Sequence, residues 1–567
     1  MTAPSQTPLQ QQTYDVIILG SGAGGLATAA AAAQQGLSVL VLEKAPCLGG
    51  TSAWSGGWMW VPRNPLAQAA GIQEPLEAPL RYLEELMGQP VTDKRILAYL
   101  EQCPEAVAFF KDTLGIQFMD GNAVPDFHNL PHGVKGGRSV CAAAFDGKQL
   151  GDWLHCLRPP LAPMSLWGMG IASGADLKHF FNGTRKLSSA VHVLKRVSRH
   201  LWDLVRYGRA TQLVNGNSLV AQLLKACVDR GVELKTSAQV QRLIQQDTRV
   251  TGVEVCVGSQ SHTLVARCGV VLATGGFPHD KGRQQQLFNA SHGLQHFSAA
   301  PKTNTGDGMT LGETAGGQVA SDLAQPGAWS PVSLVPNGQG EFDHFPHLIE
   351  RAKPGIIAVL PNGQRFTNEA DSYHDFMQAL FDATPKGQEP YCWLLADHTA
   401  QRRWGLGAAK PMPFSLTPYL RSGYLKKGDT LAALATECDL PVPALEQTVA
   451  RFNQQACAGH DPDFLRGVSP YNQVQGDGDH QPNPALGELS NGPFYAVKVV
   501  AGSLGTFAGL KTNAQAQVLD AKGEPIAGLF AAGNDISSIF NGYYPSGGIT
   551  LGPALTFGYI AAAQLAQ

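Results

Sequence analysis

The sequence contains no paired cysteine motif. Its ten cysteines stand singly between Cys47 and Cys457, without a CxxC pair, a CxxCH haem-attachment sequence or zinc-ligand spacing. Scattered single cysteines are typical of a reducing compartment, where disulfides are rare. We therefore expect a cytoplasmic protein that binds neither zinc nor a covalently attached haem through its cysteines.

Long apolar runs and excess charge are also missing. No run of 18 apolar residues occurs, and the Ala-rich stretch from Leu26 to Ala33 has the length of a helix in a nucleotide-binding fold. The segment before Tyr14 is polar and lacks Lys and Arg, so we expect neither a signal peptide nor an anchor there. A net charge of −3 gives no basic excess, which argues against nucleic acid as a partner.

The first motif that is present begins at Tyr14. Residues 14–19 (YDVIIL) form an apolar run of strand length, followed by GSGAGG and an Ala-rich helical stretch. This is GxGxxG on Gly20, Gly22 and Gly25 at a strand-to-helix turn, as in a Rossmann dinucleotide site. A second buried strand ends on Glu43, where a carboxylate can accept the ribose hydroxyls. The sequence therefore predicts an α/β fold with a Rossmann-type domain.

Three further segments indicate that the dinucleotide is FAD. Small residues and hydroxyls at 49–52 (GGTS) and 55–57 (SGG) let the chain lie along a pyrophosphate and a flavin edge, whereas a nicotinamide site needs no such second loop. Two later strands run into glycine turns, at 270–276 (VVLATGG) and 529–535 (LFAAGND). A nicotinamide-dependent enzyme would need a second dinucleotide fingerprint, and the sequence has none.

The segment 533–563 carries a second kind of chemistry. A loop rich in Gly, Asn and Ser turns into an apolar helix near Thr550, and the N-terminus of a helix favours electron-rich ligand groups. Two phenols, Tyr543 and Tyr544, precede Gly547 and Gly548 in this loop. Phenols beside glycine N–H groups can form an oxyanion hole for a carbonyl. The alternative for these residues alone is a buried loop whose tyrosines have ordinary partners.

Taken together, these motifs resemble the flavoprotein family of fumarate reductases and 3-ketosteroid dehydrogenases. The segment 362–369 (NGQRFTNE) also matches the family's GxRFxNE, and the resemblance covers nearly the whole chain. It implies an FAD domain of the GR2 type with an inserted α+β substrate domain. The motifs and the resemblance assign FAD to Gly20, Gly22, Ala23, Gly25, Glu43, Lys44, Gly50, Thr51, Ser52, Gly56, Gly57, Val240, Ala273, Gly275, Gly276, Gly533, Asn534, Thr550 and Leu551.

The length of 567 residues and 44% hydrophobic content allow two or three domains with full cores. We expect the first part of the FAD domain at 1–335, with a helical cover at about 66–210, the substrate domain at 336–490, and the C-terminal return of the FAD domain at 491–567. The segment 477–480 (DGDH) has too few ligands for a calcium loop, so we expect no metal site. The oligomeric state is left open.

One helix of the cover, at 188–209, places its apolar residues near one face and its basic residues elsewhere. A basic amphipathic helix can lie on a membrane surface. We favour ordinary packing of the apolar face with a solvated basic face, and keep peripheral membrane contact as the alternative.

The residues at two family positions favour an uncharged ketone as substrate. Dicarboxylate reductases need fixed arginines, because two substrate carboxylates in a dry pocket must be paired. Here those positions hold Tyr373-His374 and Tyr544-Pro545-Ser546. A fumarate-type activity stays an alternative, with substitute arginines at Arg351, Arg365, Arg402 and Arg403.

By resemblance to the ketosteroid dehydrogenases, Tyr544 and Gly548 would hold the C3 carbonyl oxygen while Tyr373 takes the α-proton and hydride leaves for flavin N5. A further family tyrosine is missing, because residues 125–128 read PDFH. Either this phenol is lost or His128 stands in for it, as a proton shuttle. We favour 1,2-desaturation of ring A. Ser546 keeps a Δ4-dehydrogenase open, and a quinone or another carrier is the expected electron acceptor. A non-catalytic flavin carrier would not need the second domain and its phenols.

Overall fold

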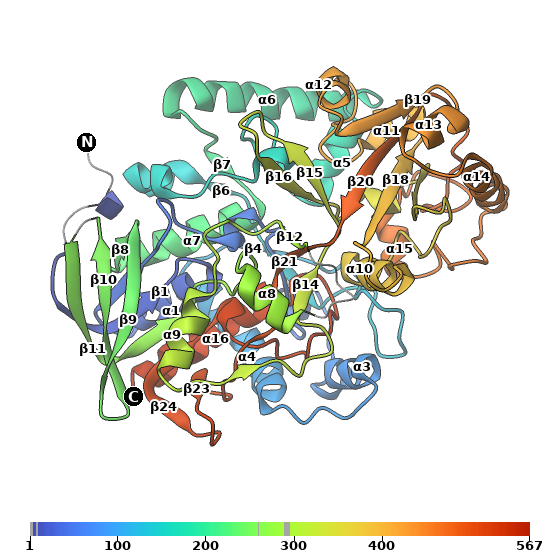
Figure 1. Cartoon of the computed structure of the whole chain (residues 1–567). Helices are drawn as coiled ribbons and strands as arrows, with labels where there is room; N and C mark the ends of the chain where they lie inside the picture. The colour runs from blue at the N-terminus through green and yellow to red at the C-terminus, as the bar shows by residue number, and fades with distance from the viewer. Residues whose placement is uncertain (1–3, 7–8, 259, 289–294) are drawn as a thin grey trace.

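The structure is a computed structural model that describes residues 4–6, 9–258, 260–288 and 295–567 (Figure 1). Its largest sheet is built around β1, the apolar run before the glycine turn. Strands β1, β2, β8, β11 and β24 pair in parallel, in the order β24-β11-β1-β2-β8, and β23, β9 and β10 add antiparallel pairs. Their bounds are β1 Thr13–Leu19, β2 Val39–Leu42, β8 Glu233–Lys235, β9 Ala238–Gln246, β10 Arg249–Val257, β11 Gln260–Leu272, β23 Gln517–Leu519 and β24 Pro525–Ala531.

The two ends of the sequence meet on this sheet. Helix α1 (Ala23–Gln34) packs against α16 (Leu551–Leu565) and α7 (Asn215–Asp229), and Figure 1 shows blue α1 beside red α16. The contact is close, because a Cβ on Gly558 would lie 2.9 Å from the carbonyl oxygen of Gly24. Parallel strands buried on both faces require such helical cover. The predicted Rossmann-type α/β fold is confirmed.

A second sheet carries the α+β unit. Its order is β16-β15-β20-β18-β17 with β19 beside β20, and all its pairs are antiparallel. The strands are β15 Val332–Pro336, β16 Phe342–Pro346, β17 Ile356–Val359, β18 Tyr391–Ala396, β19 Leu425–Gly428 and β20 Phe494–Val500. Strand β15 begins before the predicted limit at 336, and β20 lies wholly after the predicted limit at 490. The helices around them are α10 Tyr373–Ala383, α11 His398–Trp404, α12 Thr417–Arg421, α13 Leu431–Glu437, α14 Val442–Cys457 and α15 Pro470–Gln475.

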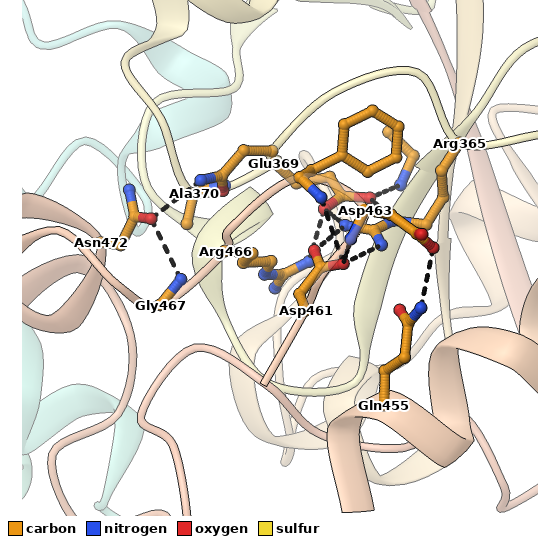
Figure 2. A network of polar contacts seen from close by, with 12 residues as sticks. Arg365, Glu369, Ala370, Gln455, Asp461, Asp463, Arg466, Gly467 and Asn472 are labelled. Carbon is orange, nitrogen blue, oxygen red and sulfur yellow. Dashed lines mark hydrogen bonds and ion pairs between the residues drawn. The ribbon is translucent and has the colours of Figure 1, made fainter. Parts of the chain in front are cut away.

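The charged residues of the RFTNE segment form a buried network in this second unit. Glu369 is fully buried and accepts hydrogen bonds from Arg365 at 2.8 and 2.7 Å and from Arg466 at 2.9 Å, and Arg365 also pairs with Asp461 at 2.8 Å (Figure 2). Glu369 further accepts the backbone N–H of Ala358 in β17. The segment therefore ties a loop to the central sheet, and Arg365 is committed to this network.

The region predicted as a helical cover holds helices and short strands, two of which pair with β3 in a small sheet. The helices are α2 Pro65–Ala69, α3 Glu77–Met87, α4 Lys94–Asp112, α5 Ala175–Phe181 and α6 Leu187–Tyr207, and the sheet pairs β3 Trp58–Trp60, β5 Ser139–Ala142 and β4 Phe118–Asp120. Helix α4 packs on α16, whereas α6 lies along the top of the molecule in Figure 1. In the ranges given above, no helix has both the length and the apolar character of a membrane span.

Helix α6 has its apolar face in solvent. The expectation that this face packs inside the protein is wrong, since Leu194 is 67% and Val205 85% exposed. The residues of α6 that are buried are polar, namely Ser189, His200 and Asp203. Each of these three buried side chains has a hydrogen-bond partner on the inward side of the helix.

Candidate active site

One cavity of about 1130 Å³ runs between the two units. Its wall includes the glycine turn after β1, the end of β2, the loop at 50–57 and the start of α16 on one side. On the other side it includes Tyr373, Tyr471 and Tyr544. The residues assigned to FAD and the phenols therefore share one space.

The glycine turn is shaped for close backbone approach. Gly20 has φ +103°, and a Cβ there would lie 2.1 Å from the carbonyl oxygen of Ala273. Gly22 and Gly50 lie side by side on the cavity wall, since a Cβ on Gly50 would be 3.7 Å from the Cα of Gly22. A wall without side chains at this turn fits a pyrophosphate beside the start of α1.

Glu43 is oriented at the end of β2 by its neighbours. Its Oε2 accepts hydrogen bonds from the N–H and Oγ of Ser21 at 3.1 and 2.6 Å, and its Oε1 accepts the N–H of Ala45 at 2.8 Å. The next residue, Lys44, pairs with Asp307 at 2.8 Å. A carboxylate held in this way on the cavity wall fits the ribose of an adenosine.

Of the residues that the sequence assigns to FAD, all but two line the cavity. The exceptions are Gly25 and Gly276, which are needed for packing. A Cβ on Gly25 would lie 2.0 Å from the oxygen of Gly20, and one on Gly276 would lie 2.1 Å from Oγ1 of Thr506. The set thus fits FAD, with the pyrophosphate at the glycine turn and the ribose at Glu43.

The sequence reasoning missed one part of this wall and one buried carboxylate behind it. The segment from Thr303 to Asp307 lines the cavity although it carries no motif that we used. Asp535 joins the two later glycine turns, because its carboxylate accepts the N–H groups of Thr274 and Gly276 at 2.5 and 2.9 Å. An acid immediately after the glycine turn of LFAAGND was the available signal.

The two principal phenols meet directly. Tyr373 is the first residue of α10, and the hydroxyl of the N-cap residue Ser372 accepts the N–H of Asp375. The hydroxyl of Tyr373 donates to the hydroxyl oxygen of Tyr544 at 2.7 Å. The rings are nearly perpendicular, with centroids 5.1 Å apart. The loop that carries Tyr544 is fixed, because the carbonyl of Pro545 accepts the hydroxyl of Tyr82 at 2.6 Å.

Burial controls the acidity of this pair. Tyr373 is 9% and Tyr544 4% exposed. Burial raises the pKa of Tyr544 to about 12, although the hydrogen bond from Tyr373 lowers it in part. The pKa of Tyr373 is raised well above its ordinary value. Burial is the main cause, and the charge of Tyr544 and the hydrogen bond to it act in the same direction. Both phenols are therefore protonated at neutral pH when no ketone is bound.

At the position of the missing family tyrosine, Phe127 and not His128 lines the cavity. Phe127 stacks on Tyr544 with ring centroids 5.6 Å apart and lies edge-on to Tyr373. The Nε2 of His128 is 3.2 Å from the carbonyl oxygen of Tyr544, and its Nδ1 is 3.8 Å from Asp375. The structure thus places His128 against the backbone behind the phenols.

A further phenol that the sequence reasoning did not single out is Tyr471. It lines the cavity and its ring centroid is 4.6 Å from that of Phe127. Burial raises the pKa of its hydroxyl well above the ordinary value. In contrast, the hydroxyl of Tyr543 points to the carbonyl oxygen of Met87, at 3.5 Å.

Gly548 lines the cavity together with Tyr544. Its φ of +96° and the 2.4 Å from a Cβ to the oxygen of Trp58 leave room only for glycine. Its carbonyl accepts the N–H of Trp60 at 3.3 Å. This turn places the start of α16 against the cavity.

The alternative activities depend on Ser546 or on arginines, and none of these residues lines the cavity. Ser546 is fully buried, and it is not part of the cavity wall. Among the residues that the structure describes, no arginine lines the cavity. Arg351 donates to the carbonyls of His347 and Glu369, and Arg402 to that of Phe414. Arg403 pairs with Asp477 at 2.7 Å.

Comparison with known proteins agrees with this geometry. The model of the FAD binding domain family matches residues 15–551. The chain belongs to this FAD-binding family. The resemblance to 3-ketosteroid dehydrogenases is likewise confirmed at full length, and the protein is a flavoprotein oxidoreductase that uses FAD.

Three relatives are similar over 98% of the chain. A 4-oxocyclohex-2-ene-1-carboxylate 5-dehydrogenase from Sinomonas cyclohexanicum is 37% identical over 94% of its own length. A 3-oxosteroid 1-dehydrogenase from Mycolicibacterium smegmatis is 34% identical over 97% of its length. The solved structure of a 3-ketosteroid Δ1-dehydrogenase from Sterolibacterium denitrificans in complex with 1,4-androstadiene-3,17-dione is 34% identical, with a TM-score of 0.89 over the whole of that chain.

Proposed function

We propose that the protein desaturates ring A of a 3-ketosteroid between C1 and C2. The observation that carries this proposal is the contact between Tyr373 and Tyr544, beside Gly548, in the cavity that the FAD residues also line. The Δ1-dehydrogenase relatives support the choice of bond and substrate. The reaction removes a proton from C2 and a hydride from C1 as the C1–C2 double bond forms.

Each residue has a separate task in this scheme. The hydroxyl of Tyr544 and the N–H of Gly548 donate to the ketone oxygen, where negative charge develops when C2 is deprotonated. Tyr373, ionised, accepts the C2 proton on its phenolate oxygen. When bound, FAD supplies the acceptor for the hydride. The apolar ring of Phe127 and the buried position of both phenols exclude water from the reacting carbons.

The same wall disfavours the two alternatives from the sequence. A Δ4-dehydrogenase that used Ser546 would need its hydroxyl in the cavity, and Ser546 is not part of the wall. A fumarate-type site would need guanidinium groups for two carboxylates, and the described wall contains no arginine. Both observations favour 1,2-desaturation of an uncharged ketone.

A smaller ring ketone with one carboxylate is a second candidate, because one relative acts on 4-oxocyclohex-2-ene-1-carboxylate. The cavity wall contains a buried ammonium, Lys353, which donates to the carbonyls of Gln475 and Gly476 at 2.6 and 2.7 Å. Burial lowers its pKa to about 8, so it is largely charged at neutral pH. A substrate carboxylate could take its third N–H.

Anaerobic mixing with neutral and acidic ring ketones tests both candidates. We expect 5α-3-ketosteroids and 4-ene-3-ketosteroids to bleach the flavin and to give 1-ene and 1,4-diene products by mass spectrometry and NMR. With 4-oxocyclohexanecarboxylate we expect little bleaching. Bleaching by the acid alone, abolished in Lys353→Met, would select the second candidate, and a saturated ketone converted only to a 4-ene would refute the choice of bond.

The Glu43→Ala variant is expected to be purified with less FAD, because it removes a charge-assisted contact to the ribose. The measurement is the ratio of flavin to protein absorbance, and Glu437→Ala at the surface of α13 serves as the matched control. We also expect acid precipitation to release all the flavin. Yellow chromophore left on the precipitate would contradict non-covalent binding, and normal flavin content in Glu43→Ala would contradict the ribose contact.

The electrons must leave the protein to an external carrier. We propose a quinone or a similar acceptor, since the sequence contains one dinucleotide fingerprint, and that fingerprint belongs to the FAD site. A quinone analogue should therefore restore the flavin colour after anaerobic bleaching, whereas oxidised nicotinamide cofactors should not.

A further inference from the structure

The outward face of helix α6 is apolar along its length except at Ser198, which is exposed on the same side. We define the outer face as six large side chains, each between 50% and 85% exposed: Leu187, Val191, Leu194, Leu201, Trp202 and Val205. Their spacing places them on one side of the helix. Next to α6, Trp167 is also 61% exposed, and its carbonyl oxygen is 3.1 Å from Nε2 of His200. Monomeric soluble proteins rarely expose a continuous apolar patch of this kind without a use for it.

The inner side of α6 is fixed by polar contacts, so the outer face cannot turn inward without breaking them. Asp203 accepts hydrogen bonds from the N–H and the hydroxyl of Thr211 at 3.0 and 2.8 Å. Arg196 pairs with Asp176 of α5 at 2.7 Å. The helix is therefore held with its apolar side outward, the reverse of an ordinary surface helix.

Exposed cations lie along the same helix. Lys195, Arg199 and Arg206 are all exposed and, on the helical spacing, fall along one flank of the outer face. The single acidic residue of α6 is Asp203, which is buried. An apolar face with a cationic flank, a tryptophan and no exposed acid has the composition of a helix that lies in a membrane interface.

We propose that the outer face of α6 docks on an anionic lipid bilayer. The apolar side chains enter the boundary between headgroups and acyl chains, and the three cations lie at the lipid phosphates. A second copy of the chain fits less well. A two-fold contact brings identical surfaces together, and this helix has no exposed carboxylate to meet its own cations.

The docking surface lies next to segments that line the cavity. Lys186, directly before α6, pairs with Asp479 at 2.7 Å and so joins α6 to the segment 473–478, which lines the cavity. Helix α5, which packs on α6, contributes Leu177 and Phe181 to the same wall. Val474 on this wall is 56% exposed. An apolar ketone dissolved in the bilayer could thus enter the cavity without crossing water.

Co-sedimentation of the holoenzyme with vesicles tests the docking. We expect binding to phosphatidylcholine vesicles that contain phosphatidylglycerol and much weaker binding to phosphatidylcholine alone. Leu194→Asp combined with Val205→Asp should abolish binding. The triple variant Lys195→Gln, Arg199→Gln, Arg206→Gln should weaken binding to anionic vesicles by about a hundredfold, at roughly fivefold for each charge. Met119→Asp, an exposed apolar residue on β4, is the matched control and should bind as the unaltered protein does.

Two outcomes would overturn the proposal. One is an unaltered protein that stays in the supernatant with anionic vesicles. The other is a stable dimer by light scattering that Leu194→Asp with Val205→Asp converts to a monomer, because a second copy would then cover the face. Vesicle binding is measured without turnover, and the variants should keep normal flavin content, so the result does not depend on the proposed function.

Discussion

Tyr544→Phe and Tyr373→Phe should each lower turnover by at least about a hundredfold, the usual scale for the loss of an oxyanion donor or of a general base. Tyr544 loses the hydroxyl that meets the ketone oxygen, and Tyr373 loses the group that accepts the proton. The two hydroxyls are 2.7 Å apart and both rings stay packed in the variants. Flavin content should therefore remain normal while stopped-flow bleaching becomes slow.

The neighbouring phenol provides a matched control. The hydroxyl of Tyr543 points to the carbonyl oxygen of Met87 and away from the reacting pair. Tyr543→Phe should therefore keep a near-normal rate. Near-normal rates in Tyr373→Phe or Tyr544→Phe would place the chemistry elsewhere in the cavity.

The acidity of the pair gives the sign of the pH dependence. Burial raises the pKa of Tyr544 to about 12 and that of Tyr373 well above its ordinary value. The base is active only when it is ionised. Because its pKa is raised, the ionised fraction is small at neutral pH and grows as the pH rises. We therefore expect the rate of flavin bleaching to increase with pH above neutrality in the unaltered protein.

The cofactor half of the site could be predicted because its determinants are local. A strand, three glycines, a helix and the acid after the next strand lie within about 30 residues, as in a βαβ unit. The glycines are required by backbone contacts such as that between Gly20 and Ala273, which no side chain can tolerate. Asn304 and Asp307 were missed since their place on the wall depends on a turn far along the chain.

The phenol half depends on contacts between distant segments. Family motifs indicated Tyr373 and Tyr544, whose contact spans 171 positions. The resemblance could not show that Phe127 would take the cavity position while the next residue, His128, contacts the backbone of Tyr544. Tyr471 carries no motif and enters the wall only through the packing of α15.

Helix α6 illustrates a different limit. Its amphipathic pattern predicted a helix correctly, but an amphipathic helix can present either side to the protein. The choice here depends on polar partners such as Thr211 and the carbonyl of Trp167, which the periodicity of α6 does not contain.

The buried charges in Figure 2 lead to the second large effect. Glu369→Gln should lower the free energy of unfolding of the second unit by about 3–5 kcal/mol, the usual cost of removing one partner of a buried ion pair. The variant removes the negative charge that meets Arg466, which is fully buried and otherwise donates to the carbonyls of Ile356, Arg351 and Lys353. Denaturant unfolding followed by tryptophan fluorescence measures the difference.

Asp463→Asn, in the same network, is the matched control. Its partner Arg451 has a side chain that is 64% exposed, and exposed pairs contribute at most about 1 kcal/mol. A loss of stability in Glu369→Gln no larger than in Asp463→Asn would show that the buried charge is not what holds the unit together.

The lowered pKa of Glu369 sets the pH range in which its ion pairs stabilise the fold. Burial raises the pKa of Glu369, but the charges of Arg365 and Arg466 outweigh it and lower the pKa from 4.5 to about 2. A carboxyl group whose pKa is lower in the folded than in the unfolded protein stabilises the fold above its unfolded pKa, and the stabilisation is lost as the pH falls toward the folded value. The gap in stability between the unaltered protein and Glu369→Gln should therefore be full at neutral pH and narrow below about pH 4.5, where the unfolded carboxyl takes up its proton. A gap that stays constant down to pH 3 would mean that glutamine disturbs the packing around β17 and not the ion pairs.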